Sequence, residues 1–319
     1  MVRTVGGIVV VDGEAVRKRL TPAACIPIVR NAMIALSSGR VSQQLRSFIP
    51  LAPGRTFAIM PAALGGEEVF GAKLISVFVH PDGRKAHEGL VVLFDAASGA
   101  PVGLVDAAAV TEIRTAAASA AATEALARPD ATTLALLGTG LQAAAHIDAI
   151  AAVRPLETVR VWARSVDTAQ AFAASQSTRT GLKIEGFAEA SDAVANTDIV
   201  CTVTGAADPI LRRAWLSPGT HVNAVGSSGP GQAELDIDLV ADSRFIADHA
   251  EHVLAHGGEF LRAKAAGRVD DTHIAAEIGQ VFAGLRPGRK SRDQITVYKS
   301  LGHAAQDLAV ASWLLRGGA

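Results

Sequence analysis

Three cationic side chains could fix a carboxylate substrate. They are Arg46 in QLRSFIP, Lys73 in GAKLIS and Arg114 in TEIRTAA. The planar guanidinium groups of Arg46 and Arg114 suit a carboxylate, whereas Lys73 is a point charge whose pKa can move when it is desolvated. An unpaired ammonium among apolar strand residues would be costly. These side chains are therefore candidate ligands of a carboxylate substrate, with solvated surface charges as the alternative.

A glycine pattern in TTLALLGTGLQAAAHIDAIAAV indicates a dinucleotide site. Gly138, Gly140 and Ala143 form a G-x-G-x-x-A pattern directly after an apolar strand and at the start of a helix. The first glycine permits a tight turn, the second lets the backbone approach a pyrophosphate, and Ala143 allows close packing of helix on strand. The predicted binding residues in this segment are Gly138, Thr139, Gly140, Leu141, Gln142 and Ala143.

The next strand, TVRVWARS, ends where a carboxylate would bind the ribose hydroxyls of NAD(H). It carries Arg164 and Ser165 there instead. An arginine at this place favours a 2′-phosphate, so the sequence predicts NADP(H), with NAD(H) as the other possible cofactor. A solvated arginine at a strand end is the alternative interpretation of Arg164.

The elements that must position these residues follow two patterns. Residues 69–105 alternate apolar runs with the turn sequences HPDG and AASGAP, which predicts antiparallel strands in hairpins. A helix is expected over residues 21–36, with Thr21 as cap and Pro22 at its first position. After Thr111 the segment TEIRTAAASAAATEALA favours a helix, and short strands then alternate with helices. The strand candidates are TLALLGTG, TVRVWARS, LKIEGF, DIVCTVTG, THVNAVGSSG and RFIADH.

Strands separated by helices predict a parallel sheet, so the expected fold class is α/β, with a doubly wound Rossmann-type sheet and a β-rich domain. The Rossmann domain is predicted over residues 120–297. The β-rich domain comprises residues 1–119 together with residues 298–319, whose helix SLGHAAQDLAVASWLL returns to pack on it.

Composition narrows the classes of function. Thirty Lys and Arg residues balance 31 Asp and Glu residues without a long block of like charge, which argues against a nucleic-acid partner. Cys25 and Cys201 lack paired spacing, so neither a disulfide framework nor a metal site is expected. The N-terminal apolar run ends at Asp12, and no apolar stretch approaches the roughly 18 residues of a membrane span. A cytoplasmic protein without a membrane partner is expected.

Five blocks of sequence resemble the ornithine cyclodeaminase and mu-crystallin family in the same order, over nearly the whole chain. The resemblance implies a homodimer whose first domain binds substrate and forms the dimer interface, while its Rossmann domain holds the nicotinamide. Members include cyclodeaminases, alanine dehydrogenases and ketimine reductases that act on small α-imino or α-amino acids. The blocks are GAKLIS (71–76), HEGLVVLFDAASGAPVGLVDAAAVTEIRTAAASA (87–120), LLGTGLQA (136–143), NAVGSSGPGQAELD (223–236) and EIGQVFAGLRPGRKSRDQITVYKSLG (277–302).

The resemblance also implies roles for residues. Arg46, Lys73 and Arg114 bind the substrate carboxylate, and either Lys73 or a bound water delivers the proton. His87 is another possible proton shuttle, since an unperturbed histidine titrates near neutrality. A structural histidine beside the turn is the alternative interpretation of His87. Glu277 and Asp307 could be pocket carboxylates, but capping or ion pairing would explain them equally. The loops that border the nicotinamide contribute Thr204, Val225, Gly226, Ser300 and Gly302.

Ser228 bears on the chemistry. Cyclodeaminases of this family carry an aspartate at its place, and a serine hydroxyl near neutral pH is no base unless it is activated. A ketimine reductase needs only to orient a readily protonated imine, which Ser228 can do by hydrogen bonding. We therefore expect reduction of Δ1-pyrroline-2-carboxylate or Δ1-piperideine-2-carboxylate to L-proline or L-pipecolate. An ornithine cyclodeaminase or amino-acid dehydrogenase is one alternative, and an NADPH-dependent ligand-binding protein of the mu-crystallin type is another.

Overall fold

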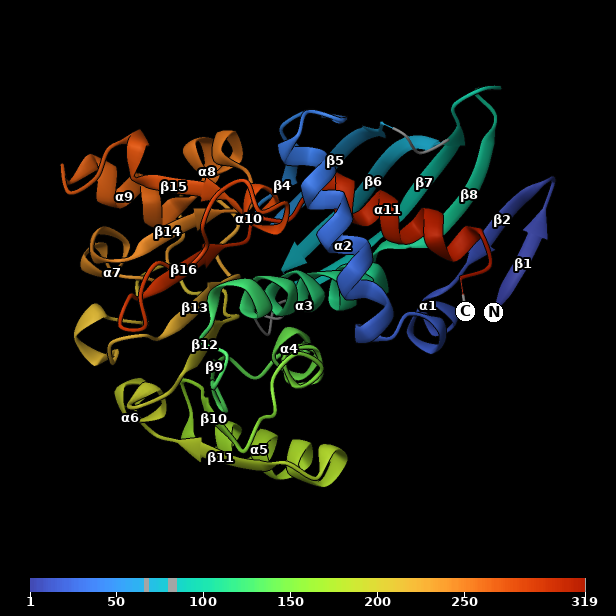
Figure 1. Ribbon diagram of the computed structural model, residues 1–319. Helices are drawn as coiled ribbons and strands as arrows, with labels where there is room; N and C mark the ends of the chain where they lie inside the picture. The colour runs from blue at the N-terminus through green and yellow to red at the C-terminus, as the bar shows by residue number, and fades with distance from the viewer. Residues whose placement is uncertain (66–68, 80–84, 319) are drawn as a thin grey trace. The chain divides into compact units, whose positions relative to one another are not determined.

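The computed structural model describes residues 1–65, 69–79 and 85–318, except for the side chains of residues 79 and 85–87. The chain divides into two compact units. The first comprises Met1–Thr115 and His303–Ala319, and the second comprises Ala116–Gly302. Figure 1 labels the elements of both units.

The first unit is a mixed, mostly antiparallel sheet with helices. Its sheet has the order β1-β2-β8-β7-β6-β5-β3, and β4 pairs with β5. Only the β2–β8 pair is parallel among the pairings described. The elements are β1 (Val2–Val5), β2 (Ile8–Val11), α1 (Gly13–Arg19), α2 (Pro22–Ser37), β3 (Val41–Gln43), β4 (Ser47–Ala52), β5 (Arg55–Leu64), β6 (Val69–Val79), β7 (Lys85–Asp95), β8 (Pro101–Asp106), the start of α3 (Ala107–Leu126), and α11 (Ala304–Leu315).

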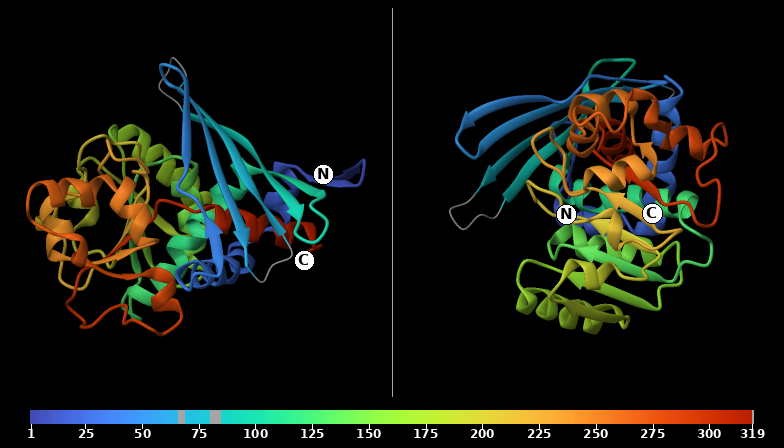
Figure 2. Two further views of the ribbon diagram at one scale, coloured as in Figure 1. Left: turned by 90° about the horizontal axis from the view of Figure 1, so that it is seen from above. Right: turned by 90° about the vertical axis from the view of Figure 1, so that its left-hand side faces the viewer.

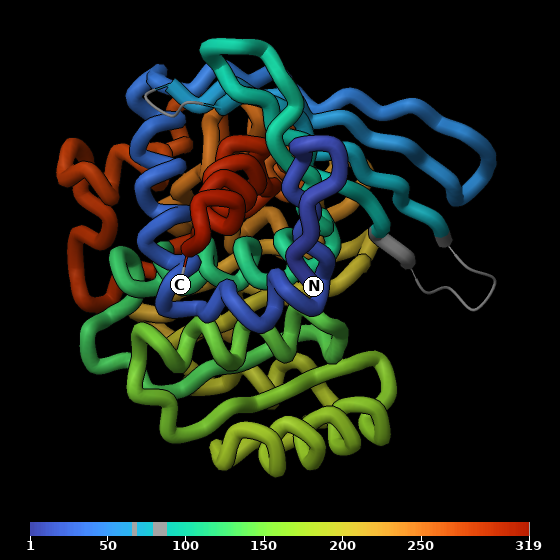
Figure 3. The backbone as a smooth tube through the Cα atoms, turned by 90° about the vertical axis from the view of Figure 1, so that its right-hand side faces the viewer, coloured from blue at the N-terminus to red at the C-terminus, as the bar shows by residue number. Residues whose placement is uncertain are grey.

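Two helices cover the core side of this sheet. The helix α2 begins where predicted, because the Thr21 side chain accepts a hydrogen bond from Ala24 N and Pro22 occupies the first turn. The C-terminal helix α11 buries nearly all its residues; it packs against α2 and lies on β5 and β6. Figure 3 shows α2 and α11 side by side, and the left-hand view of Figure 2 shows the long strands that α11 crosses. The chain's two ends thus build one core.

The second unit is a parallel sheet with the order β11-β10-β9-β12-β13-β16-β14-β15. The first half winds outward from β9 and the second half winds the other way from β12, as in a doubly wound fold. The elements are β9 (Thr133–Leu137), α4 (Leu141–Ala151), β10 (Thr158–Trp162), α5 (Val166–Thr180), β11 (Lys183–Phe187), α6 (Ala190–Val194), β12 (Ile199–Thr202), η1 (Arg213–Trp215), β13 (His221–Ala224), α7 (Ile237–Asp242), β14 (Arg244–Ala247), α8 (Ala250–His256), α9 (Gly258–Ala265), η2 (Asp271–His273), β15 (Ile274–Glu277), α10 (Ile278–Phe282) and β16 (Thr296–Lys299).

The expected α/β fold class is confirmed, and all six strand candidates of the second unit are strands, β9 to β14. The antiparallel pairing of β6, β7 and β8 is also as expected. The turn sequence HPDG, residues 80–83, lies outside the described residues. The sequence did not predict β1 to β5, β15 or β16, and α3 begins four residues before Thr111 while α11 begins at Ala304 rather than Ser300.

One apolar cluster in the core of the second unit runs from β9 to β16 and includes Phe245 and Phe260, whose rings lie 5.3 Å apart. In the described part of the chain, no single helix is long and apolar enough to cross a membrane, and only the pair α1 and α2, bent by 95°, reaches that length and composition together. All strands of the second sheet point the same way, so their following loops gather at one edge.

Candidate functional site

Lys73 and Arg114 meet at one buried carboxylate. Asp307 Oδ1 lies 3.3 Å from Lys73 Nζ and accepts a hydrogen bond of 3.0 Å from Arg114 Nε. All three side chains are buried within the first unit. Lys73 comes from the middle of β6, Arg114 from α3 and Asp307 from the first turns of α11. Among the described residues, two cations thus face one anion in this buried group.

Neutral groups fix the two cations further. Lys73 Nζ donates to Thr111 Oγ1, which lies on α3 one turn before Arg114 and therefore on the same helix face. Arg114 Nη1 donates to Gln306 Oε1 at 3.0 Å. The start of α11 is tied to β3, since Ala305 N donates to Gln43 Oε1. These contacts hold the cations in fixed positions without neutralising them.

The electrostatics of the cluster differ for its members. Burial lowers the pKa of Lys73 to about 8, and the charges of Arg114 and Arg46 act in the same direction, while Asp307 opposes them. Burial acts to raise the pKa of Asp307, but the charges of Arg114 and Lys73 outweigh it and hold that pKa below its usual range. At neutral pH the cluster therefore holds an ionised Asp307 beside a mostly protonated Lys73.

The structure brings the three predicted cations into one neighbourhood of the first unit. Arg46 precedes β4, is half-buried, and acts electrostatically on Lys73. Asp307 forms ion pairs, which was one of the interpretations of this residue from the sequence. Glu277 is a helix cap: it precedes α10 in a capping box and accepts a hydrogen bond from Ala250 N. The side chain of His87 lies outside the described residues.

The predicted dinucleotide loop joins β9 to α4 in the second unit. Gly138 has a φ of +129°, and a Cβ there would lie 2.9 Å from the carbonyl oxygen of Val203, so only glycine fits without strain. At Gly140 a Cβ would meet no atom within 4 Å, and this residue caps α4 without a side-chain hydrogen bond. Leu141 is 72% exposed, Thr139 and Gln142 flank it in the same turn, and Ala143 is buried. The turn before α4 is therefore open at Gly140 and Leu141.

Arg164 and Ser165 lie just after β10, at the carboxyl end of the strand next to β9. The Arg164 side chain is exposed. Ser165 caps α5, because its side chain accepts a hydrogen bond from Thr168 N. Ser165 therefore has a structural role of its own, whereas Arg164 is exposed at the strand end.

The other predicted residues of the second unit lie at the carboxyl ends of β12, β13 and β16. Thr204, Val225 and Gly226 follow the first two strands, and Ser300 and Gly302 follow β16. Ser228, in the loop after β13, is exposed. The sequence-predicted residues of this unit are thus gathered at one edge of its sheet, where ligands of doubly wound folds bind.

Buried carboxylates that the sequence interpretation missed hold these loops. Asp248 Oδ2 accepts hydrogen bonds from Leu301 N and Gly302 N, which follow β16. Glu234 accepts hydrogen bonds from the loops after β12 and β13, and burial raises its pKa although the Thr204 donors and the charge of Lys299 oppose that shift. One signal in the sequence could have indicated buried carboxylates here. Lys299 is a charged residue inside the apolar run ITVYKSLG, and such a residue is rarely buried without a partner.

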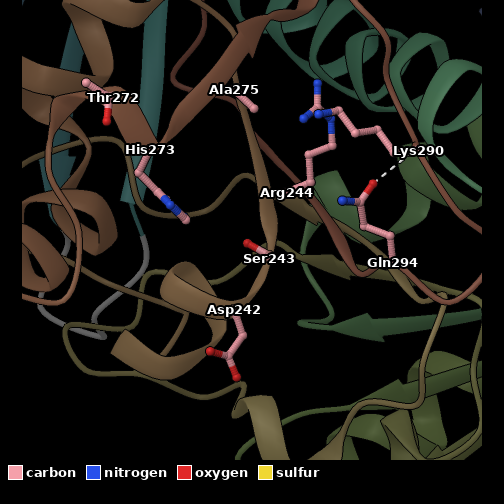
Figure 4. Close-up of a pocket in the computed structure, with 8 residues that line it drawn as sticks. All are labelled: Asp242, Ser243, Arg244, Thr272, His273, Ala275, Lys290 and Gln294. Carbon is pink, nitrogen blue, oxygen red and sulfur yellow. Dashed lines mark hydrogen bonds between the residues drawn. The ribbon is translucent and has the colours of Figure 1, made fainter.

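A surface pocket lies elsewhere in the second unit, at the amino ends of β14, β15 and β16 (Figure 4). Its Arg244 donates to the backbone carbonyls of Gly288 and Pro287, and its His273 Nε2 contacts the carbonyl of Val240. The polar groups of this pocket therefore hold local backbone, and they lie at the sheet edge opposite the predicted dinucleotide residues. Its lining residues are Asp242, Ser243, Arg244, Thr272, His273, Ala275, Lys290 and Gln294.

The sequence was compared with models of known protein families. The model of the ornithine cyclodeaminase/mu-crystallin family matches residues 9–316. The chain belongs to this family. The resemblance expected from five separate blocks is thereby confirmed.

Members of the ornithine cyclodeaminase/mu-crystallin family with assigned activities match the chain along most of its length. The Delta(1)-pyrroline-2-carboxylate reductase of Bacillus cereus is 34% identical over 309 residues, which are 96% of this chain and 95% of that protein. The ketimine reductase mu-crystallin of Mus musculus is 34% identical over 292 residues, 90% of this chain and 89% of that protein.

Solved structures of the same family share the whole fold. The Delta(1)-pyrroline-2-carboxylate reductase of Thermococcus litoralis, in complex with NADH and L-proline, superposes with a TM-score of 0.90 at 30% identity and covers 97% of this chain and 98% of its own. An archaeal alanine dehydrogenase dimer with bound NAD has a TM-score of 0.88 at 28% identity, with 97% of each chain covered. Reductases and dehydrogenases thus share this fold.

Proposed function

We propose that this protein reduces cyclic ketimine carboxylates with NADPH. When bound, NADPH would supply the hydride for the imine carbon, and with a proton for the imine nitrogen the products would be NADP⁺ and a cyclic amino acid. The substrates are Δ1-pyrroline-2-carboxylate, which gives L-proline, or Δ1-piperideine-2-carboxylate, which gives L-pipecolate. The relatives named as reductases at 34% identity support reduction of this substrate class.

The observation that carries the proposal is the pair of buried cations, Lys73 and Arg114, that meet at one carboxylate in the described part of the first unit. Among the described residues, Lys73 and Arg114 both contact the carboxylate of Asp307, and the charge of Arg46 acts on Lys73. A buried unbalanced cation is costly until an anion joins it. A substrate carboxylate supplies that anion, and the Arg114 fork and Lys73 point charge orient it.

The proton donor is Lys73 or a bound water. With a pKa of about 8, Lys73 is protonated at neutral pH and can also release its proton in that range. Ser228 orients the substrate by hydrogen bonding and brings no charge. The absence of a carboxylate at position 228 favours imine reduction over ornithine cyclisation, whose proton transfers need a base.

The cofactor assignment rests on the second unit. The open turn at Gly138 and Gly140 and the uncapped start of α4 suit a pyrophosphate. Exposed Arg164 after β10 suits a 2′-phosphate and supports NADPH over NADH. The solved relatives were determined with NADH or NAD, so NADH is the competing cofactor and both are included in the tests.

The test is an assay of purified protein with NADPH and each of the two imines. We expect NADPH oxidation that depends on the imine, and no such oxidation by Arg114→Met, which keeps the apolar stem but loses the charge. No oxidation above the buffer rate in the unaltered protein would refute the proposal. Ammonia release from ornithine with NAD⁺ would identify a cyclodeaminase, and tight NADPH binding without turnover of any imine or amino acid would identify a ligand-binding protein.

We further propose that the protein is a homodimer through the first unit. Every residue of β4 is exposed, and Phe48, Ile49 and Leu51 expose about half of their surface, at 48%, 45% and 56%. Exposed apolar groups of this size on one strand are typical of an interface. The alanine dehydrogenase relative is a dimer, which supports the same assembly. Light scattering should report twice the chain mass for the unaltered protein and a single chain mass for Ile49→Glu; a monomeric unaltered protein would refute the assembly.

A further inference from the structure

One buried carboxylate joins the two loops that follow β12 and β13. Glu234 Oε1 accepts hydrogen bonds from Thr204 N and Thr204 Oγ1, both at 2.7 Å. Its Oε2 accepts hydrogen bonds from Thr202 Oγ1 at 2.8 Å and from Gly226 N at 2.7 Å. Each oxygen therefore has one backbone amide and one hydroxyl as donors. The Glu234 side chain is fully buried, so no water replaces these contacts at its surface.

The two loops also touch each other directly. A Cβ on Gly226 would lie 2.1 Å from the carbonyl oxygen of Thr204 and 2.4 Å from its nitrogen, distances that no side chain can occupy. The backbone after β13 therefore packs onto the backbone after β12, and the Glu234 carboxylate fastens both from one side. Thr204 and Gly226 keep a fixed spacing because of this contact.

A second layer of charged groups supports Glu234 and the loop that carries Ser228. Glu259 Oε1 accepts a hydrogen bond from Glu234 N at 3.0 Å, and its Oε2 lies 3.0 Å from Lys299 Nζ. Lys299 Nζ donates to the carbonyl of Ser227 at 2.6 Å, and Ser227 Oγ donates to the carbonyl of Gln232. Glu259 and Lys299 are also buried. The two ends of the loop from Val225 to Glu234 are thus held by charged groups, and the Ser227 hydroxyl joins one end to Gln232.

Such a network of buried charges is expected to add little to the free energy of unfolding. Buried ion pairs often contribute no more than apolar residues of the same volume, because removing the charges from water offsets their attraction. What they supply is orientation, since every partner has a defined direction. The network occurs at the carboxyl ends of the second-half strands β12, β13 and β16, where a doubly wound fold binds the nicotinamide half of a dinucleotide while its first half binds the adenosine half.

We propose that Glu234 is a positioning residue for the nicotinamide half of the cofactor, acting through Thr204 and Gly226. The inference rests on the proposed use of a nicotinamide dinucleotide. In this proposal the Thr204 hydroxyl has a structural role, because it donates to Glu234 and not to the cofactor. Glu234 itself need not touch the cofactor, because it sets the spacing of the two loops that do.

The test compares NADPH with 2′-phospho-ADP-ribose, which is the same cofactor without its nicotinamide. Glu234→Gln keeps the shape but replaces one oxygen by an amino group, which then faces a backbone N–H or a hydroxyl that needs an acceptor. We expect the dissociation constant of NADPH to rise about tenfold or more, as for a lost hydrogen bond to a charged group. The dissociation constant of 2′-phospho-ADP-ribose should change less than about twofold.

A matched control exists at the opposite edge of the same sheet. The Asp198 carboxylate also fastens strand ends: it accepts hydrogen bonds from Thr132 N, Thr133 N and Thr133 Oγ1 and pairs with Arg128, at the amino ends of β9 and β12. Asp198→Asn should lower the melting temperature, as should Glu234→Gln, but it should leave the ratio of the two dissociation constants unchanged. A general loss of stability would therefore be separated from a loss of positioning.

Several outcomes decide the inference. Equal weakening of both ligands by Glu234→Gln, or no weakening of either, would overturn it while leaving the proposed function standing. If the unaltered protein bound neither NADPH nor NADH, the proposed function and this inference would both be refuted. If Glu234→Gln did not fold, Thr202→Val would remove one of the four donors with little change of shape, and we expect the same selective weakening of NADPH at about threefold or more. An unchanged ratio in Thr202→Val would overturn the inference.

Discussion

Asp307 Oδ1 lies 3.0 Å from Arg114 Nε, and this contact joins residues 193 positions apart in the chain. The same oxygen lies 3.3 Å from Lys73 Nζ. One carboxylate on the C-terminal helix therefore sets the place of two cations from β6 and α3. Its removal should be felt both in stability and in ligand binding.

The substitution Asp307→Asn should destabilise the protein strongly. It leaves two buried cations without their anion, and breaking a buried pair in this way costs about 3–5 kcal/mol. The free energy of unfolding, measured by urea denaturation, would report this loss. Asp148→Asn is the matched control, because Asp148 forms an exposed pair with Arg179 and its loss should cost only about 0.2–1 kcal/mol. Similar losses in both variants would contradict the role of Asp307.

Carboxylate binding should weaken as the pH rises through about 8. Burial lowers the pKa of Lys73 to about 8, so the free protein loses this cation above that pH. The dissociation constant of pyrrole-2-carboxylate, a planar carboxylate without a basic nitrogen, should then rise by up to about tenfold per pH unit. Lys73→Met should bind more weakly at neutral pH and show a flat profile. A bend near pH 8 that persists in Lys73→Met would assign the titration to another group.

The same lowered pKa makes a prediction for stability. The pKa of an unfolded lysine is near 10.5, above the folded value of about 8. Between these values the unfolded chain binds more protons at this position, so the contribution of Lys73 to the free energy of unfolding should increase as pH rises through that window. Denaturation of the unaltered protein and of Lys73→Met at pH 7.5 and 9.5, two values chosen on either side of about pH 8, would measure it. An equal change with pH in both proteins would refute the assignment.

Arg164→Asp should weaken NADPH far more than NADH. Loss of a charge-assisted hydrogen bond to the 2′-phosphate costs about 1.5–3 kcal/mol, which is roughly 10- to 100-fold in the dissociation constant. NADH lacks this phosphate and should change little. Lys183→Asp introduces the same charge change at the amino end of the neighbouring strand β11 and should not alter the preference. Equal losses for both cofactors in Arg164→Asp would show that Arg164 does not contact the 2′-phosphate.

Ser228→Asp alone should not produce ornithine cyclodeamination. The loop that carries residue 228 is held by the Lys299 contact with the Ser227 carbonyl, but a cyclodeaminase also needs a pocket that admits and folds the longer diamine. Ammonia release from ornithine with NAD⁺, followed in the unaltered protein and in the variant, is the measurement. Robust release after this single change would show that the loop residue alone selects the reaction.

Most of the second unit could be predicted because buried parallel strands appear as short apolar runs between helices. The strands β9 to β14 all have this form. β16 lacks it, because Tyr298 and Lys299 interrupt the run, and β15 is only Ile-Ala-Ala-Glu. The first hairpin, β1–β2, turns at Gly6 and Gly7 with positive φ, a turn signal that the prediction left unused.

The sequence allowed the residues of the candidate site to be predicted, but not the contacts between them. Lys73 was recognised because a charge stands out among apolar residues, Arg114 because the family resemblance implied it, and Gly138 and Gly140 because their spacing has a backbone reason. For Asp307, the sequence did not distinguish a pocket carboxylate from a capping or ion-paired residue. Only the tertiary structure brings α11 to β6 and α3. Glu234 looked like the first polar residue after a loop, and nothing local indicates that its carboxylate accepts four hydrogen bonds.

The place of β16 has a consequence for biosynthesis. This last strand of the chain lies between β13 and β14, so a nascent chain emerging from the ribosome has a gap inside its parallel sheet until Thr296–Lys299 has been made. The next element is α11, which covers the other sheet. Domains usually fold in order during translation. Here both units are completed by the same late segment, so a chain cut before Thr296 would yield neither.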